Sequence, residues 1–182
     1  MTRRRDVMAG DADKFCDVPG REGVPPDPSI TRELFLKWRS PRPGSSNPEP
    51  MTNPVWNWLV GSKLNAYQAT QKFDGPSAME AGPGWCFDRF GQSATQLPDG
   101  RIVLIAGEHA DHYDPDFYIY NDVVVQNPDA QLEFFGYPRD VFPPTDFHSA
   151  TLVRNGILSM VQLGSTNKLQ PTQTTFIVLP SG

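Results

Sequence analysis

The chain has 182 residues, a net charge of −5 at neutral pH, and one short basic run, Arg3-Arg4-Arg5. This length allows one domain with a substantial core, and the acidic balance argues against a nucleic-acid-binding surface. Nineteen prolines and fifteen glycines favour short strands and turns over long helices. No apolar run reaches the roughly 18 residues of a membrane span and no secretory signal is visible, so we expect a cytoplasmic protein.

Residues 1–50 differ in composition from the rest of the chain. They contain eight prolines, and the stretch from Ser40 to Pro50 suits neither a helix nor a central strand. Only the stretch from Ile30 to Trp38 has enough apolar residues to be buried. We therefore predict a mostly disordered segment with one short helix. One interpretation of this composition is that the natural protein begins at Met51.

Residues 51–84 are predicted to form a helix and a loop that pack on the strands that follow. Asn53 can cap a helix and Pro54 suits its first turn. Apolar residues then recur at intervals of three and four, which predicts one helix over 53–73. A loop rich in glycine and proline follows over 76–89.

From residue 85 onward, short runs of strand-forming residues alternate with turn signals. The pair Asp99-Gly100 is a strong signal for a hairpin. The pattern predicts an antiparallel meander of four strands, over 92–97, 101–106, 121–126 and 131–135.

The order of these features then begins again. Ser93-Ala94-Thr95 precede a turn and an apolar strand that ends at Gly107, and Ser149-Ala150-Thr151 precede the same pattern, which ends at Gly164. The two copies lie 56 residues apart. A period near 50 residues with four strands in each unit is typical of a propeller blade of the Kelch kind.

The run from Arg89 to Thr95 with the strands after it resembles a Kelch repeat, and so does the second copy from Phe147 to Gly164. The chain is therefore similar to Kelch-repeat β-propellers, including the central domain of galactose oxidase, over about residues 85–182. The resemblance implies a mainly β fold of about one and a half antiparallel four-stranded blades, the second one incomplete. It also implies a protein-binding role through blade loops instead of catalysis.

The predicted loop over 108–120 is the best candidate for a contact surface. It combines acids, histidines and aromatic residues, and aromatic residues with a polar rim are typical of binding hot spots. The residues that we expect to contact a protein partner are Tyr113, Phe117, Tyr118 and Tyr120.

The same loop also carries possible metal ligands. Imidazole and carboxylate groups bind Zn²⁺, Mn²⁺ and Fe²⁺, and this loop offers His109, Asp111, His112 and Asp114. The alternative function is therefore a metal-dependent enzyme that uses loop 108–116. Apart from this divalent metal, we expect no cofactor.

A third interpretation is a truncated propeller fragment without activity of its own. The second unit stops before its fourth strand, and one blade cannot bury both of its faces alone. An open blade edge favours self-association.

Overall fold

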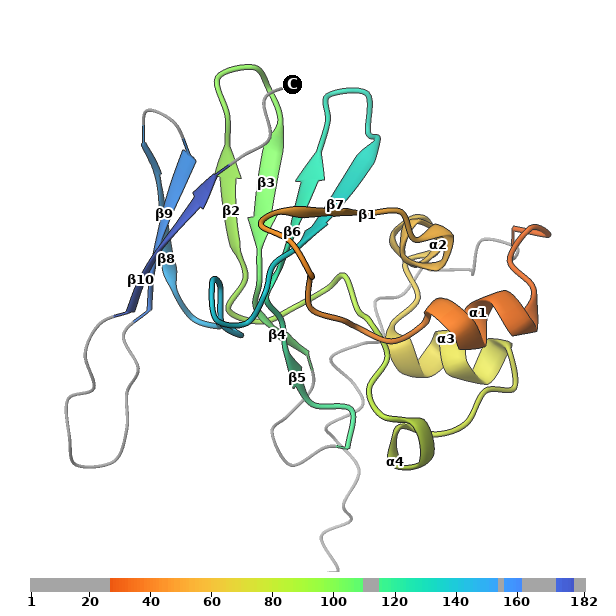
Figure 1. Cartoon of the computed structure of the whole chain (residues 1–182). Coiled ribbons are helices and arrows are strands. Elements are labelled where there is room, and N and C mark those ends of the chain that lie inside the picture. Colours follow the sequence, from red (N-terminus) through yellow and green to blue (C-terminus); the bar gives the residue numbers. More distant parts are fainter. Residues whose placement is uncertain (1–26, 110–114, 154–155, 162–172, 179–182) are drawn as a thin grey trace, which may run out of the picture.

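The structure is a computed structural model that describes residues 27–109, 115–153, 156–161 and 173–178 (Figure 1). Its helices and strands follow one another as α1 (Arg32–Trp38), β1 (Glu49–Met51), α2 (Pro54–Ser62), α3 (Ala66–Lys72), α4 (Ala78–Ala81), β2 (Ser93–Gln96), β3 (Ile102–Ile105), β4 (Glu108–His109), β5 (Tyr118–Ile119), β6 (Asp122–Gln126), β7 (Leu132–Gly136), β8 (Ser149–Val153), β9 (Gly156–Val161) and β10 (Gln173–Val178). The mainly β, antiparallel character predicted from the sequence is confirmed.

The larger sheet has five strands in the order β1-β7-β6-β3-β2, and each neighbouring pair is antiparallel. Its last four strands are the meander predicted from the sequence. The central strands β3 and β6 pair Val103 with Val125 and Ile105 with Val123. All four of these side chains are buried on one face, and Val124 and Leu104 pack on the opposite face, which explains why the strands read as nearly continuous apolar runs.

A smaller sheet, in the order β10-β9-β8, packs on one face of the larger sheet. It begins with the second Ser-Ala-Thr sequence. Between the two sheets lies a buried cluster that joins Val125 and Phe135 of the larger sheet to Ile157 and Ile177 of the smaller one. The described strands form no closed ring of blades.

Helices cover the opposite face of the larger sheet (Figure 1). Val124 and Phe134, which alternate with residues that face the smaller sheet, pack there against Trp56 of α2. Trp56 in turn stacks on Trp85, with their ring centroids 5.0 Å apart. The molecule therefore has three layers: helices, a five-stranded sheet and a three-stranded sheet.

The segment before residue 51 is more ordered than its composition suggests. Within the described residues 27–50, which we expected to be mostly disordered, α1 buries Phe35 against Phe73, with ring centroids 4.6 Å apart. Strand β1 pairs with β7 at the edge of the larger sheet. Pro50 is tolerated there because an edge strand has one side free of ladder hydrogen bonds.

The helix predicted over 53–73 is divided in two. Lys63 adopts a left-handed conformation (φ 56°) that ends α2. Asn65 then caps α3, accepting a hydrogen bond from the Gln68 backbone while the Gln68 side chain bonds back to the Asn65 amide. The short helix α4 lies inside the predicted 76–89 loop. None of the helices in the described ranges is long and apolar enough to cross a membrane.

Candidate functional site

Three long segments meet at one end of the two sheets, at the lower end of the sheets in Figure 1. We call this the long-loop end, and it comprises the described residues 82–92, 106–109, 115–121 and 137–148. At the other end of the larger sheet, the short turns β2–β3 and β6–β7 join the described strands. Long segments on a rigid sheet are where binding residues are usually carried, so this end is the candidate site.

Backbone hydrogen bonds hold these three segments together. Phe90 and Glu108 exchange two such bonds, of 2.9 and 2.8 Å. The Gly107 amide donates to Thr145, and the Thr145 amide donates to Tyr120, each at 2.9 Å. The long-loop end is therefore held in a defined conformation over its described residues.

Two phenylalanines stand out on this surface. Phe90 is 61% exposed and Phe147 is 71% exposed. The two belong to neighbouring parts of the site, because the Phe147 backbone and ring pack closely on Gly91. Val141, in the third segment, is also exposed. Exposed large apolar side chains that gather at one end of a molecule mark an interaction surface.

The backbone at Phe147 is held in an unfavourable conformation. Its φ of 42° lies in the left-handed region, where a bulky residue is uncommon. A side chain at Gly91 would collide with the Phe147 backbone nitrogen, and Gly91 itself has a φ of 60°. The fold therefore tolerates a strain of about 1 kcal/mol that keeps an aromatic ring in the solvent.

A serine and a histidine from the two repeat units meet beside these rings. Ser93 Oγ, in β2, lies 2.8 Å from Nε2 of His148, which directly precedes β8, so this contact links the two sheets. Partial burial lowers the pKa of His148, and the charge of Asp146 opposes this effect. His148 is therefore mainly neutral at pH 7 and acts as a hydrogen-bonding link between the sheets.

This pair lacks the support that a hydrolytic site needs. In a catalytic triad a carboxylate holds the second imidazole nitrogen. The His148 Nδ1 atom is buried and has no hydrogen-bond partner among the described residues. In the neutral form of His148 with its proton on Nε2, the unpaired Nδ1 atom is an acceptor and Nε2 donates to Ser93 Oγ. An imidazole nitrogen that donates to the serine cannot take the serine proton, so this arrangement does not activate Ser93 as a nucleophile.

A buried polar cluster forms the base of the long-loop end. Arg89 donates to both carboxylate oxygens of Asp122, with Nη2 and Oδ2 3.0 Å apart, and Trp85 Nε1 donates to the same carboxylate at 2.9 Å. The Arg89 guanidinium lies 3.4 Å from the centroid of the Tyr120 ring. Tyr120 Oη accepts from the Cys86 amide at 2.9 Å. This cluster anchors the 82–92 segment to β6.

Burial also makes the two ionisable protons in this cluster hard to remove. It raises the pKa of the Cys86 thiol to about 11, and it raises the pKa of Tyr120 well above its usual range. Both groups are therefore neutral at physiological pH, and Cys86 is a free, buried thiol.

The residues predicted to contact a partner differ in how deeply the structure buries them. Tyr120 is 1% exposed and belongs to the core, so it supports the surface from beneath instead of forming it. Tyr118 and Phe117 are half-buried at the long-loop end, and Tyr118 Oη accepts a hydrogen bond from Arg139 at 3.3 Å. Tyr113 lies outside the described residues.

Three of the four predicted metal ligands lie outside the residues that the structure describes. His109 is half-buried in β4, whereas Asp111, His112 and Asp114 fall outside the described residues. Elsewhere in the described ranges, no three His, Cys, Asp or Glu side chains converge as a metal site would require.

Sequence reasoning did not single out Phe90 and Phe147. Both occur in the motif that identified the repeat, just before the Ser-Ala-Thr sequences. The available signal was that Phe90 directly precedes Gly91 and that Phe147 lies two residues before the second Ser-Ala-Thr sequence.

Comparisons with protein-family models, with curated proteins and with solved structures found no match to this chain.

Proposed function

We propose that the chain is a non-enzymatic protein-interaction module built from Kelch-like blade units, and that it binds its partner through the long-loop end. The observation that carries the proposal is the exposed pair Phe90 and Phe147, with Phe147 in a strained backbone conformation. Aromatic residues dominate the binding energy of many protein interfaces, and strained conformations gather at binding sites.

The surroundings of the pair support the same role. The two rings lie on segments held by backbone hydrogen bonds, so little conformational freedom is lost on binding. Tyr118 and Arg139 add polar groups from two of the three segments. An apolar centre with a polar rim is the usual anatomy of a protein interface, and it fits a protein partner that presents an apolar side chain.

The blade part of the proposal rests on the repeated unit. Strands β2 and β8 both begin with Ser-Ala-Thr, and each forms an antiparallel pair with the strand that follows it, β3 and β9. Ser93 and His148 occupy neighbouring positions of this motif in successive units and hydrogen-bond to each other. Such a contact between successive units is what a repeat architecture requires.

Pull-down with the tagged full chain, followed by mass spectrometry, tests the proposal. The Phe90→Ser/Phe147→Asn double variant should lose the specific partner at least about tenfold. Tyr67→Ser is the matched control, because Tyr67 is 64% exposed but lies on α3, outside the long-loop end. A partner that the double variant retains, or that Tyr67→Ser also loses, would contradict the assignment.

A further inference from the structure

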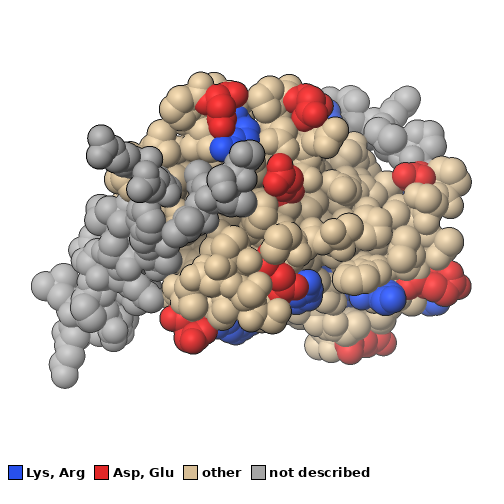
Figure 2. Space-filling model, turned by 45° about the horizontal axis from the view of Figure 1, so that its top comes forward, with Lys and Arg blue, Asp and Glu red and all other residues tan. Residues whose placement is uncertain are grey.

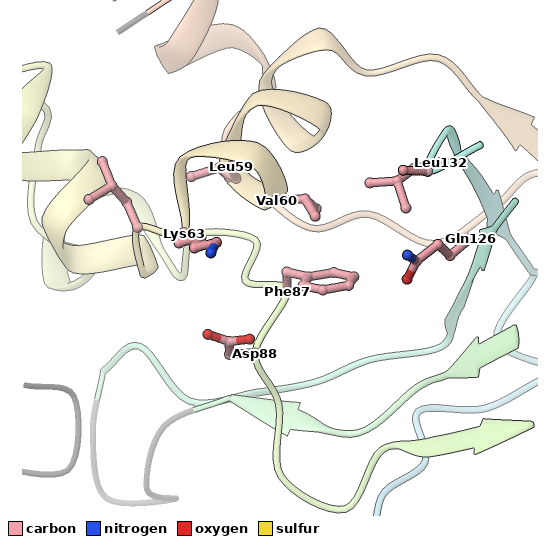
Figure 3. A pocket seen from close by; sticks show the side chains of 9 residues that line it. Leu59, Val60, Lys63, Phe87, Asp88, Gln126 and Leu132 are labelled. Carbon is pink, nitrogen blue, oxygen red and sulfur yellow. The ribbon is translucent and has the colours of Figure 1, made fainter. Parts of the chain in front are cut away.

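A cavity of about 360 Å³ lies where the end of α2 meets the β6–β7 hairpin of the larger sheet (Figure 3). The turn of this hairpin is at the opposite end of the sheet from the long-loop end. Small-molecule sites typically occupy about 300–1,000 Å³, and an apolar cavity of about 150 Å³ accommodates benzene. This cavity therefore has room for one aromatic ring or branched apolar group together with a polar group.

Apolar side chains form most of the cavity wall. Six of the nine lining residues are apolar, and they are Leu59, Val60, Leu64, Phe87, Ala130 and Leu132. Phe87 and Leu132 pack against the apolar cluster between the helices and the sheet, yet both remain half-buried. A ligand that packs on these two side chains removes further apolar surface from water, which is favourable.

The neutral polar group of the cavity is the side-chain amide of Gln126. Side chains alternate along β6, so Gln126 lies on the same face as Val124, towards the helices. It pairs across the strands with Leu132, and Figure 3 shows its amide directed towards the Phe87 ring. Within the described part of the chain, this amide has no hydrogen-bond partner. Because an amide both donates and accepts, it can bond a hydroxyl or an amide of a ligand.

The two charged residues of the cavity wall do not call for a charged ligand. Lys63 and Asp88 each already have an interaction partner within the structure, so neither brings an unpaired charge to the cavity. An ionised ligand group would lose water there without gaining a partner of opposite charge. Among the described residues on the face shown in Figure 2, charged side chains of both signs are interspersed, and no single-sign patch attracts an ion. The cavity therefore favours an uncharged ligand.

We propose that this cavity binds a small neutral molecule with one aromatic or branched apolar group and one hydroxyl or amide group. The apolar group packs among Val60, Phe87 and Leu132, and the polar group exchanges a hydrogen bond with the Gln126 amide. The exposed rings of Phe90 and Phe147 do not line the cavity, so this site is independent of the proposed partner contact.

An NMR titration that observes the ligand, with the full chain and four probes that share a benzene ring, tests this site. Benzyl alcohol is neutral and forms hydrogen bonds, toluene lacks the polar group, and benzylamine and benzoate are ionised at pH 7. We expect benzyl alcohol to bind with a dissociation constant of about 1 mM, and each ion to bind at least about tenfold more weakly. No binding of benzyl alcohol at about 10 mM, or an ion that binds as tightly as the alcohol, would overturn the proposal.

Two variants locate the binding site. Gln126→Leu removes the amide and should lower the affinity for benzyl alcohol relative to toluene about fivefold, the effect of one lost hydrogen bond. Val60→Trp fills the cavity and should weaken the binding of both neutral probes at least about tenfold. The matched control is Gln71→Leu on α3, which does not line the cavity and should change neither affinity.

Thermal unfolding verifies that each variant is folded. Binding of benzyl alcohol that is unchanged in both folded cavity variants would contradict the site. This outcome leaves the partner test at the long-loop end unaffected, because that test changes Phe90 and Phe147 only.

Discussion

The buried pair of Arg89 and Asp122 allows a direct test of how the long-loop end is supported. Replacing Asp122 by Asn keeps the size of the side chain but removes the negative charge that the guanidinium faces. The Arg89 side chain is fully buried and that of Asp122 is 5% exposed, so water cannot replace the lost partner. Trp85 Nε1 also loses a charged acceptor.

The expected cost of Asp122→Asn is large. Breaking a buried ion pair by removing one partner typically costs about 3–5 kcal/mol, because the remaining charge is left uncompensated. Asparagine retains one acceptor oxygen, and Arg89 keeps its bonds to the Cys86 and Ala106 carbonyls, so we expect about 3 kcal/mol. This is a major fraction of a typical folding free energy of about 5–15 kcal/mol.

Urea unfolding followed by tryptophan fluorescence measures this cost. With a slope of about 2 kcal/mol per molar, a loss of about 3 kcal/mol lowers the unfolding midpoint by about 1.5 M. The exposed Asp140→Asn variant is the control and should change stability by less than about 0.5 kcal/mol. A cost below about 1 kcal/mol for Asp122→Asn would refute the view that this ion pair anchors the segment to β6.

Three further predictions concern single residues of the same region. Phe147→Asn should leave the free energy of unfolding unchanged or raise it by up to about 1 kcal/mol, because asparagine tolerates a left-handed φ; a loss above about 1 kcal/mol in urea titrations would show that the ring is structural. Burial raises the pKa of the Cys86 thiol from 9.0 to about 11, so at pH 8 the folded protein should be alkylated at Cys86 at least about a hundredfold more slowly than an ordinary thiol. Unfolding in urea should remove this protection. Peptide mapping that finds rapid alkylation of Cys86 in the folded protein would contradict its burial. The pKa of His148 is lower in the folded state than its ordinary 6.5, so the unfolded chain takes up the proton first and the folding stability falls as the pH drops below about 6.5. The His148→Gln variant, whose side chain can still bond Ser93, should lose less stability over this pH range. Identical profiles of stability against pH for the two proteins would contradict this prediction.

The strands of the larger sheet were predictable because local sequence determines them. Residues in β3 and β6 are buried between two layers, so they are continuously apolar, and Asp99-Gly100 lies in the turn between β2 and β3. These are short-range signals, and the structure confirms the four-stranded meander they predict.

The parts of the fold that the sequence did not predict depend on contacts between residues far apart in the chain. Strand β1 has only three residues, and it forms because β7, more than 80 residues later, provides its partner. The break at Lys63 interrupts an otherwise helical apolar pattern, and the usable signal was the capping pair Asn65 and Gln68. Propensity alone is overridden in such cases by tertiary contacts.

The candidate site shows the same contrast between features that local sequence predicts and features that depend on long-range contacts. The sequence indicated that loop 108–120 is rich in aromatic residues, but it could not show that Tyr120 is buried while Tyr118 is half-exposed. This difference arises because Arg89, 31 residues earlier in the chain, lies on the Tyr120 ring. The exposure of Phe147 depends on its close contact with Gly91 of the other repeat unit, which no local pattern records.

Site-specific photo-crosslinking tests the proposed interaction most directly. A benzoylphenylalanine placed at position 147 should yield a discrete covalent adduct with a partner protein on irradiation in cells, whereas the same group at position 67, on the exposed face of α3, should not. Size-exclusion chromatography of the purified chain shows whether the partner is a second copy. Absence of an adduct at position 147, or equal adducts at both positions, would contradict binding through the long-loop end.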